Sequence, residues 1–137
     1  DYSELVSLIS NEIRESYVPI EIFTINALNP LEAIVKYLKE NKRLKFSEIS
    51  KLIGRDQRTI WITYNKIKVK VKLSTSSKLL VPLRIFNKNL SILESLVKYL
   101  KENCNFSLSH IAQILKRDQR NIWKVYNNSI KKSNEKI

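Results

Sequence analysis

The sequence predicts an all-α protein: two tandem three-helix units joined by a short extended linker, with an amphipathic helix in front of them. Three observations support this prediction. Glycine occurs once and proline three times in 137 residues, which disfavours a turn-rich β-sandwich. Leucine, isoleucine, lysine and glutamate are abundant, as in helical proteins. Finally, one pattern of helical segments is repeated along the chain.

Residues 2–16 are the first predicted element, an amphipathic helix with an apolar stripe formed by Tyr2, Leu5, Val6, Ile9 and Ile13. Its surroundings are acidic, since residues 1–27 hold five acids and one base. The stripe suits a protein partner or self-association. The alternative is that this helix packs on its own domain, which base rates favour slightly.

An internal duplication follows. Residues 28–65 and 90–127 align at an offset of 62 without a gap and are identical at 20 of 38 positions. The phrases VPIEIF at 18–23 and VPLRIF at 81–86 precede the two copies at an offset of 63, because the first copy has one extra residue. A match of this length indicates duplication. The predicted organisation is an N-terminal helix at 1–17, units at 18–68 and 81–132, a linker at 69–80 and a tail at 133–137.

Each copy predicts three helices, and the first of them starts with a capping signal. Asn29 or Ser91 is placed to cap the helix, and Glu32 or Glu94 follows at the third helical position, where it can reach back. Pro30 fits the first helical turn, where its missing N–H costs nothing.

The second and third helices are predicted from serine and aspartate caps. The second helix is short and starts near Ser47 or Ser109, and a tight break ends it. Asp56 and Asp118 then cap the third helix. Between the copies, alternating lysine and valine predict an extended stretch, and valine before proline favours extended backbone at the start of each copy.

The charge is concentrated in the duplicated region. The whole chain carries +12, and residues 1–27 carry −4, so residues 28–137 carry +16. A region this basic usually binds a polyanion. The alternative on charge alone is an ordinary domain with many lysines.

A short helix, a tight turn and a capped following helix describe the helix-turn-helix motif. The stretch FSEISKLIGRDQRTIWITYNKIK resembles region 4 of bacterial sigma factors and related tandem helix-turn-helix regulators, and the second copy matches the same pattern at 108–111 and 119–123. The resemblance covers about 23 residues per copy. It implies double-stranded DNA as the partner. Trp61 and Trp123 depart from the family, which often has a polar reader there.

Helical geometry assigns faces to the third helix. At about 100° per residue, Ile60 and Tyr64 fall on one side and Arg58 and Asn65 on the other. Arginine can pair with guanine, and asparagine or glutamine with adenine. The predicted base-reading residues are Gln57, Arg58, Trp61, Asn65, Gln119, Arg120, Trp123 and Lys124. The predicted phosphate contacts are Lys51, Arg55, Lys66, Lys116 and Arg117.

The residues disfavour several other classes of protein. His110 and Cys104 are the only residues of their types, and no paired acids or glycine loop are present, so we expect no enzyme, cofactor or metal site. No run of residues predicts a membrane span, and we expect a cytoplasmic, nucleoid-associated protein. The alternatives are a protein–protein adaptor, or the DNA-binding fragment of a larger transposase or recombinase.

Overall fold

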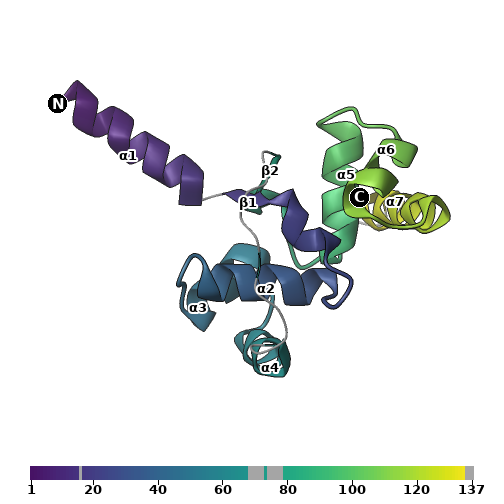
Figure 1. Cartoon of the computed structure of the whole chain (residues 1–137), viewed down its shortest axis with the longest axis horizontal. Helices are drawn as coiled ribbons and strands as arrows, with labels where there is room; N and C mark the ends of the chain where they lie inside the picture. Colours follow the sequence, from purple (N-terminus) through teal and green to yellow (C-terminus); the bar gives the residue numbers. More distant parts are fainter. Residues whose placement is uncertain (16, 68–72, 74–78, 135–137) are drawn as a thin grey trace.

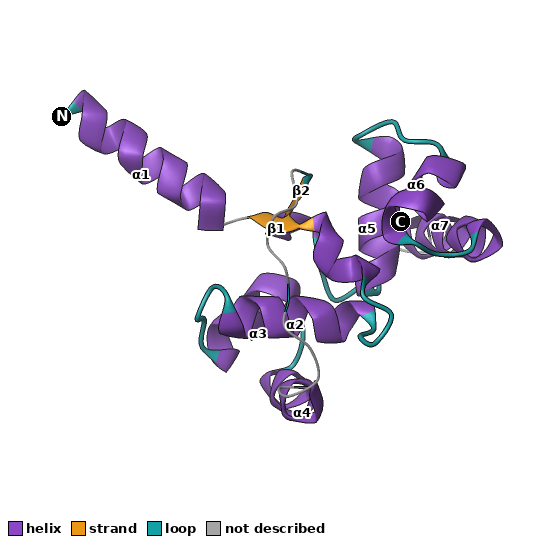
Figure 2. Ribbon diagram, in the orientation of Figure 1, coloured by secondary structure: helices purple, strands orange, loops and turns teal. Residues whose placement is uncertain are grey.

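The computed structural model describes residues 1–15, 17–67, 73 and 79–134. Within these ranges the chain is mostly helical, as the all-α prediction requires. Figures 1 and 2 show two groups of helices that meet beside a small sheet. The elements are α1 (Tyr2–Glu15), β1 (Tyr17–Pro19), η1 (Ile20–Thr24), α2 (Pro30–Glu40), α3 (Phe46–Ile53), α4 (Gln57–Ile67), β2 (Leu80–Pro82), η2 (Leu83–Ile85), α5 (Ile92–Glu102), α6 (Leu108–Leu115) and α7 (Gln119–Asn134).

We call residues 17–67 the first repeat and residues 80–134 the second repeat. Two predicted boundaries need correction. The predicted tail at 133–137 begins inside α7, which ends at Asn134. The predicted N-terminal segment 1–17 ends too late, because Tyr17 already belongs to β1. Most of the predicted linker at 69–80 lies outside the described residues.

The three helices of each repeat pack on one another. In the first repeat α2 contacts α3 and α4, and α3 contacts α4, while α5, α6 and α7 make the equivalent contacts in the second. Ile49, Ile53 and Ile60 are fully buried in the first repeat, and Ile111 and Ile122 in the second. The predicted apolar periodicity therefore marks the buried faces.

The helix starts show which caps were predicted correctly. Asn29 and Ser91 form capping boxes with the glutamates three residues later, as predicted. The second helix of each repeat starts earlier than predicted. Lys45 precedes α3, and Ser107 caps α6 by accepting a hydrogen bond from the backbone N–H of His110. Ser47 and Ser109 lie inside the helices.

The small sheet reveals how the repeats are related. β1 and β2 pair antiparallel, with Val18 opposite Val81, Tyr17 opposite Pro82 and Pro19 opposite Leu80. Val18 and Val81 are also equivalent positions of the duplication, at the offset of 63. When two antiparallel strands pair with equivalent residues opposite each other, a rotation of 180° about an axis between those residues places each strand on the other. The sequence predicted extended backbone in both segments but not that they pair.

Other contacts obey the same two-fold relation. The rings of Phe23 and Phe86, again equivalent residues, have centroids 6.3 Å apart. α6 of the second repeat contacts η1 of the first, and reciprocally α3 contacts η2. Reciprocal contacts between equivalent surfaces define a two-fold interface, so the chain forms a dimer-like pair within one polypeptide. The buried residues of both repeats belong to one continuous hydrophobic core.

The turn between α3 and α4 is held against the second repeat. Arg55 donates hydrogen bonds from Nη1 to the Asn87 carbonyl at 2.6 Å and from Nη2 to the Leu90 carbonyl at 2.8 Å. Gly54 precedes it with φ +65°, and a Cβ there would lie 2.9 Å from the backbone nitrogen of Lys88. Burial lowers the pKa of the Arg55 guanidinium. This turn therefore fixes the first repeat against the second.

α1 does not join either group of helices, and Figure 1 shows it projecting away from them. The apolar side chains of its first half are exposed, including Tyr2 at 81% and Leu8 at 65%. The expectation that this helix packs on its own domain is therefore wrong for residues 2–8. Nothing else in the described part of the chain covers their stripe.

The turns that follow α3 and α6 generate a stability prediction. Gly54 and Lys116 occupy equivalent left-handed positions, with φ of 65° and 55°. Gly54→Ala should lower the free energy of unfolding by at least about 1–2 kcal/mol, because the left-handed strain adds to the close approach to Lys88. Lys116→Gly should raise it by up to about 1 kcal/mol, since glycine relieves that strain. Urea denaturation measures both, and equal changes of the same sign would contradict this account.

A second prediction concerns acid stability. Burial opposes ionisation of Glu94, but hydrogen bonds from Lys132 and Ser91 outweigh it and hold its pKa below the ordinary 4.5. A carboxyl with a lowered pKa stabilises the folded protein above the ordinary value, and this contribution is lost as the pH falls through the folded-state value. Lys132 Nζ lies 2.8 Å from Glu94 Oε1. Glu94→Gln should therefore cost about 1 kcal/mol or less at neutral pH.

The pH profile tests the cause. The amide introduced by Glu94→Gln retains an oxygen that can accept the Ser91 N–H, so this variant isolates the charge of Glu94. The difference in unfolding free energy between the variant and the natural protein should shrink toward zero below the ordinary pKa. A difference that stays constant with pH, measured by urea denaturation, would assign the loss to packing instead.

Candidate nucleic-acid interface

α4 and α7 each bury one face and expose the other. Ile60 and Ile67 of α4, and Ile122 of α7, are fully buried against the other helices of their repeats. The positions just before the first buried residue of each helix, Gln57 to Thr59 and Gln119 to Asn121, are exposed. These positions agree with the predicted inner and outer faces of the third helix, but Asn65, predicted on the outer face, is only partly exposed.

The outer face carries the same three residue types in both repeats. Gln57 and Arg58 are exposed beside Trp61, whose exposed fraction is 54%. In α7 the equivalent glutamine and arginine are exposed beside Trp123, at 57%. The side chains of Arg58 and Arg120 make no hydrogen bond or ion pair with any residue that the structure describes. We call these six residues the exposed rows.

The two exposed rows differ at one neighbouring position. Ile62 is exposed in α4, and the equivalent Lys124 is exposed in α7. Beside the α7 row the surface is hollowed, with a cavity of about 600 Å³ lined by Asp118, Gln119, Arg120, Trp123 and Lys124. The row of the second repeat therefore has the more polar and more basic surroundings of the two.

Aspartates hold the first turn of each exposed helix. Asp118 Oδ1 accepts a hydrogen bond from the backbone N–H of Arg120 at 2.8 Å, and Asp56 Oδ2 accepts one from Thr59 N–H at 3.4 Å. Both are the caps that the sequence predicts. Because the cap lies directly before the glutamine and arginine, it fixes where their side chains emerge.

Asn65 is oriented by its own helix. Its Nδ2 donates a hydrogen bond to the Trp61 carbonyl at 2.8 Å, and Asn127 does the same to the Trp123 carbonyl. Asn65 is also only partly exposed. The structure therefore separates this predicted base-reading residue from the exposed rows, because its amide group is used within α4.

The predicted phosphate contacts fall into two groups. Lys51, Lys66 and Lys116 are exposed. The two arginines lie elsewhere: Arg55 is bonded to carbonyls of the second repeat, and Arg117 lines a cavity between the repeats. Their positions just before the capped helix made both look like flanking surface cations. The tertiary contact between repeats turns them inward.

Sequence reasoning missed a pair of contacts that orient the exposed helices. The Tyr64 hydroxyl donates a hydrogen bond to Glu40 at 2.9 Å and thereby ties α4 to α2. Tyr126 and Glu102 repeat it at 3.0 Å between α7 and α5. The pKa of each tyrosine is raised, chiefly by burial and further by the hydrogen bond to the glutamate and its negative charge. Both pairs are identical between the copies, which was the available signal.

The described part of the chain brings together no group of three or more histidine, cysteine, aspartate or glutamate residues that could hold a metal ion. None of its described helices has the length and apolar character required to cross a membrane.

Comparisons with family models, with curated proteins and with solved structures find no match to this chain.

Proposed function

We propose that this protein binds double-stranded DNA with sequence specificity and acts as a transcription regulator. In this proposal α2–α4 and α5–α7 are two helix-turn-helix units, and α4 and α7 are their recognition helices. The observation that carries it is the pair of exposed rows, each with an arginine that has no partner among the described residues, in a region with a net charge of +16.

The local geometry suits this role. A helix that enters the major groove must bury one face on its own domain and present the other to the bases. α4 and α7 do the first through Ile60 and Ile122. The left-handed turn at Gly54 or Lys116, followed by the aspartate cap, matches the short helix, turn and following helix of the motif. The resemblance to sigma-factor region 4 supports the same assignment.

Each exposed row offers chemistry that can distinguish base pairs. Arg58 and Arg120 can donate two hydrogen bonds to guanine, and glutamine can pair with adenine. Trp61 and Trp123 can contact sugar or the thymine methyl group through their exposed rings. Since Ile62 is replaced by Lys124 in the second repeat, the two half-sites need not be identical.

The exposed lysines provide the contribution that does not depend on sequence. Lys51, Lys66 and Lys116 are placed to meet phosphates beside the recognition helices. Neutralising phosphates releases bound counterions, so we expect binding to weaken steeply as salt is raised.

The arginines of the exposed rows provide the first test of this function. Arg58→Ala and Arg120→Ala should each weaken binding by roughly 1–3 kcal/mol at one preferred base position. Lys51→Ala should instead weaken binding to all sequences alike. Affinities are measured by titrating each variant against a duplex selected from a random library and against random duplex.

Arg84→Ala is the matched control, because Arg84 is exposed but lies on η2, outside the recognition helices. It should leave the base preference unchanged. If Arg58→Ala and Arg120→Ala reduce affinity equally on every sequence, the base-reading role is wrong. If the natural protein has no affinity for duplex DNA at moderate salt, the whole proposal is wrong.

The two-fold relation between the repeats generates a second test. Tandem copies along a chain could be related by translation, but here equivalent residues meet across a half-turn. Two-fold proteins bind half-sites that are inverted relative to each other, one helical turn or about 10 base pairs apart. Sequences selected from a random library should therefore be imperfect inverted repeats. Selection of direct repeats would contradict the proposed arrangement.

A further inference from the structure

The two arginines that follow the left-handed turns are equivalent in sequence but differ in their contacts. Arg55 uses Nη1 and Nη2 to bind carbonyl oxygens in residues 87–90 of the second repeat. Arg117 faces the equivalent part of the first repeat, residues 25–29. The Nε atom of Arg117 is buried and makes no hydrogen bond with any described residue. The arginine after the turn is thus hydrogen-bonded to the other repeat in the first copy, whereas in the second copy its Nε has no hydrogen-bond partner among the described residues.

The two repeats also differ in sequence at this place. Between the equivalent residues Phe86 and Leu90 the second repeat has three residues, whereas between Phe23 and Leu28 the first repeat has four. This is the extra residue that changes the offset of the duplication from 63 to 62. The longer loop does not offer Arg117 the two carbonyl oxygens that Arg55 finds.

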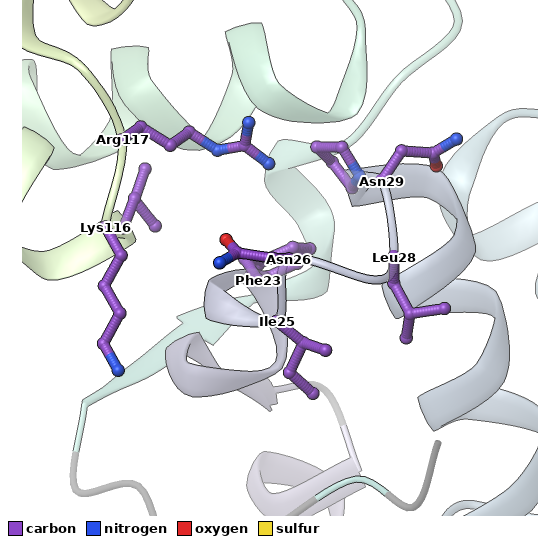
Figure 3. Close-up of a pocket in the computed structure, with 9 residues that line it drawn as sticks. Phe23, Ile25, Asn26, Leu28, Asn29, Lys116 and Arg117 are labelled. Carbon is purple, nitrogen blue, oxygen red and sulfur yellow. The ribbon is translucent and has the colours of Figure 1, made fainter. Parts of the chain in front are cut away.

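A cavity lies where the loop and the turn fail to close on each other. Its volume is about 250 Å³, and six lining residues come from the first repeat and three from the second (Figure 3). Figure 3 shows Arg117 extending toward the loop that holds Asn29, whereas the amino group of the neighbouring Lys116 points away from the guanidinium. The lining consists of Phe23, Ile25, Asn26, Leu28, Asn29, Pro30, Leu115, Lys116 and Arg117.

The chemistry of this lining indicates the ligand. It contains two cationic side chains and no carboxylate, and the rest of it is apolar or neutral. A buried N–H without a partner is costly, and a guanidinium forms its strongest hydrogen bonds with a carboxylate or phosphate. The volume is slightly below that of pockets for drug-sized ligands, which start at about 300 Å³.

We propose that this cavity between the repeats binds a small organic anion. Its carboxylate or phosphate accepts hydrogen bonds from Arg117, and its apolar part lies against Phe23, Ile25 and Leu28. A DNA phosphate is the less favoured occupant. The cavity lies at the contact between the repeats, and Arg55 at the equivalent position points into that contact. The proposal does not depend on DNA binding.

The arginine side chains themselves report binding. The full chain is labelled with ¹⁵N, and the Nε–H signals are followed by NMR while benzoate or inorganic phosphate replaces chloride at constant ionic strength. The Arg117 signal, assigned by its loss in Arg117→Lys, should shift and reach saturation with benzoate. Inorganic phosphate should bind more weakly, because it lacks an apolar part. The Arg55 signal should not move.

Two variants and one control test the site. Arg117→Gln should weaken benzoate binding by about tenfold or more, as expected for loss of a charged hydrogen bond, followed through the backbone amides of residues 23–30. Deletion of Asn26 gives the first repeat the loop length of the second and should abolish binding. Arg84→Gln, an exposed arginine outside the cavity, should bind benzoate as the natural protein does.

Three results would overturn the proposal. One is a shift of the Arg117 signal that never saturates with either anion. Another is benzoate binding that is unchanged in Arg117→Gln. The third is an Arg117 signal that responds to a short DNA duplex but to neither anion, which would make Arg117 a phosphate contact.

Discussion

The contact between the two repeats holds the whole arrangement of helices in place. The two repeats share one continuous core, to which η1 of the first adds contacts with α6 of the second, and η2 of the second adds contacts with α3 of the first. The antiparallel pair of Val18 and Val81 and the rings of Phe23 and Phe86 lie on the two-fold axis of this contact. The tandem duplication thereby has the geometry of a symmetric dimer. Because both halves belong to one chain, their association does not depend on protein concentration.

Symmetry in the core coexists with differences at the periphery. The residues on the axis and the tyrosine–glutamate pairs are the same in both repeats, because they fix how each exposed helix is held. The differences fall where they change surface chemistry: Ile62 against Lys124 on the outer face, and a longer loop opposite Arg117. A covalently joined pair can diverge in this way, whereas a homodimer has to carry every substitution twice.

The arginines illustrate how one residue type serves different purposes in similar local settings. Exposed guanidinium groups on α4 and α7 have no partner in the described part of the chain. Arg55 instead donates hydrogen bonds to carbonyl oxygens of the second repeat in place of water. Its burial there lowers the pKa of its guanidinium. Arg117 has lost its solvent at Nε without gaining an equivalent partner. Burial without compensation is costly, so such a group indicates a place where a ligand can contribute.

Local structure was readable from the amino-acid sequence alone. Helical periodicity, the Asn29 and Ser91 caps, the Asp56 and Asp118 caps and the outward position of Arg58 and Arg120 follow from interactions within a few residues, and the duplication repeats each pattern. How the copies face each other emerged only from the folded chain. The pairing of β1 with β2 and the inward turn of Arg55 and Arg117 depend on contacts between residues far apart in the chain, and the exposure of residues 2–8 reflects the absence of such contacts in the described part of the chain. Neither periodicity nor spacing predicts such contacts, because an arginine on the surface and an arginine at an interface follow the same local sequence pattern.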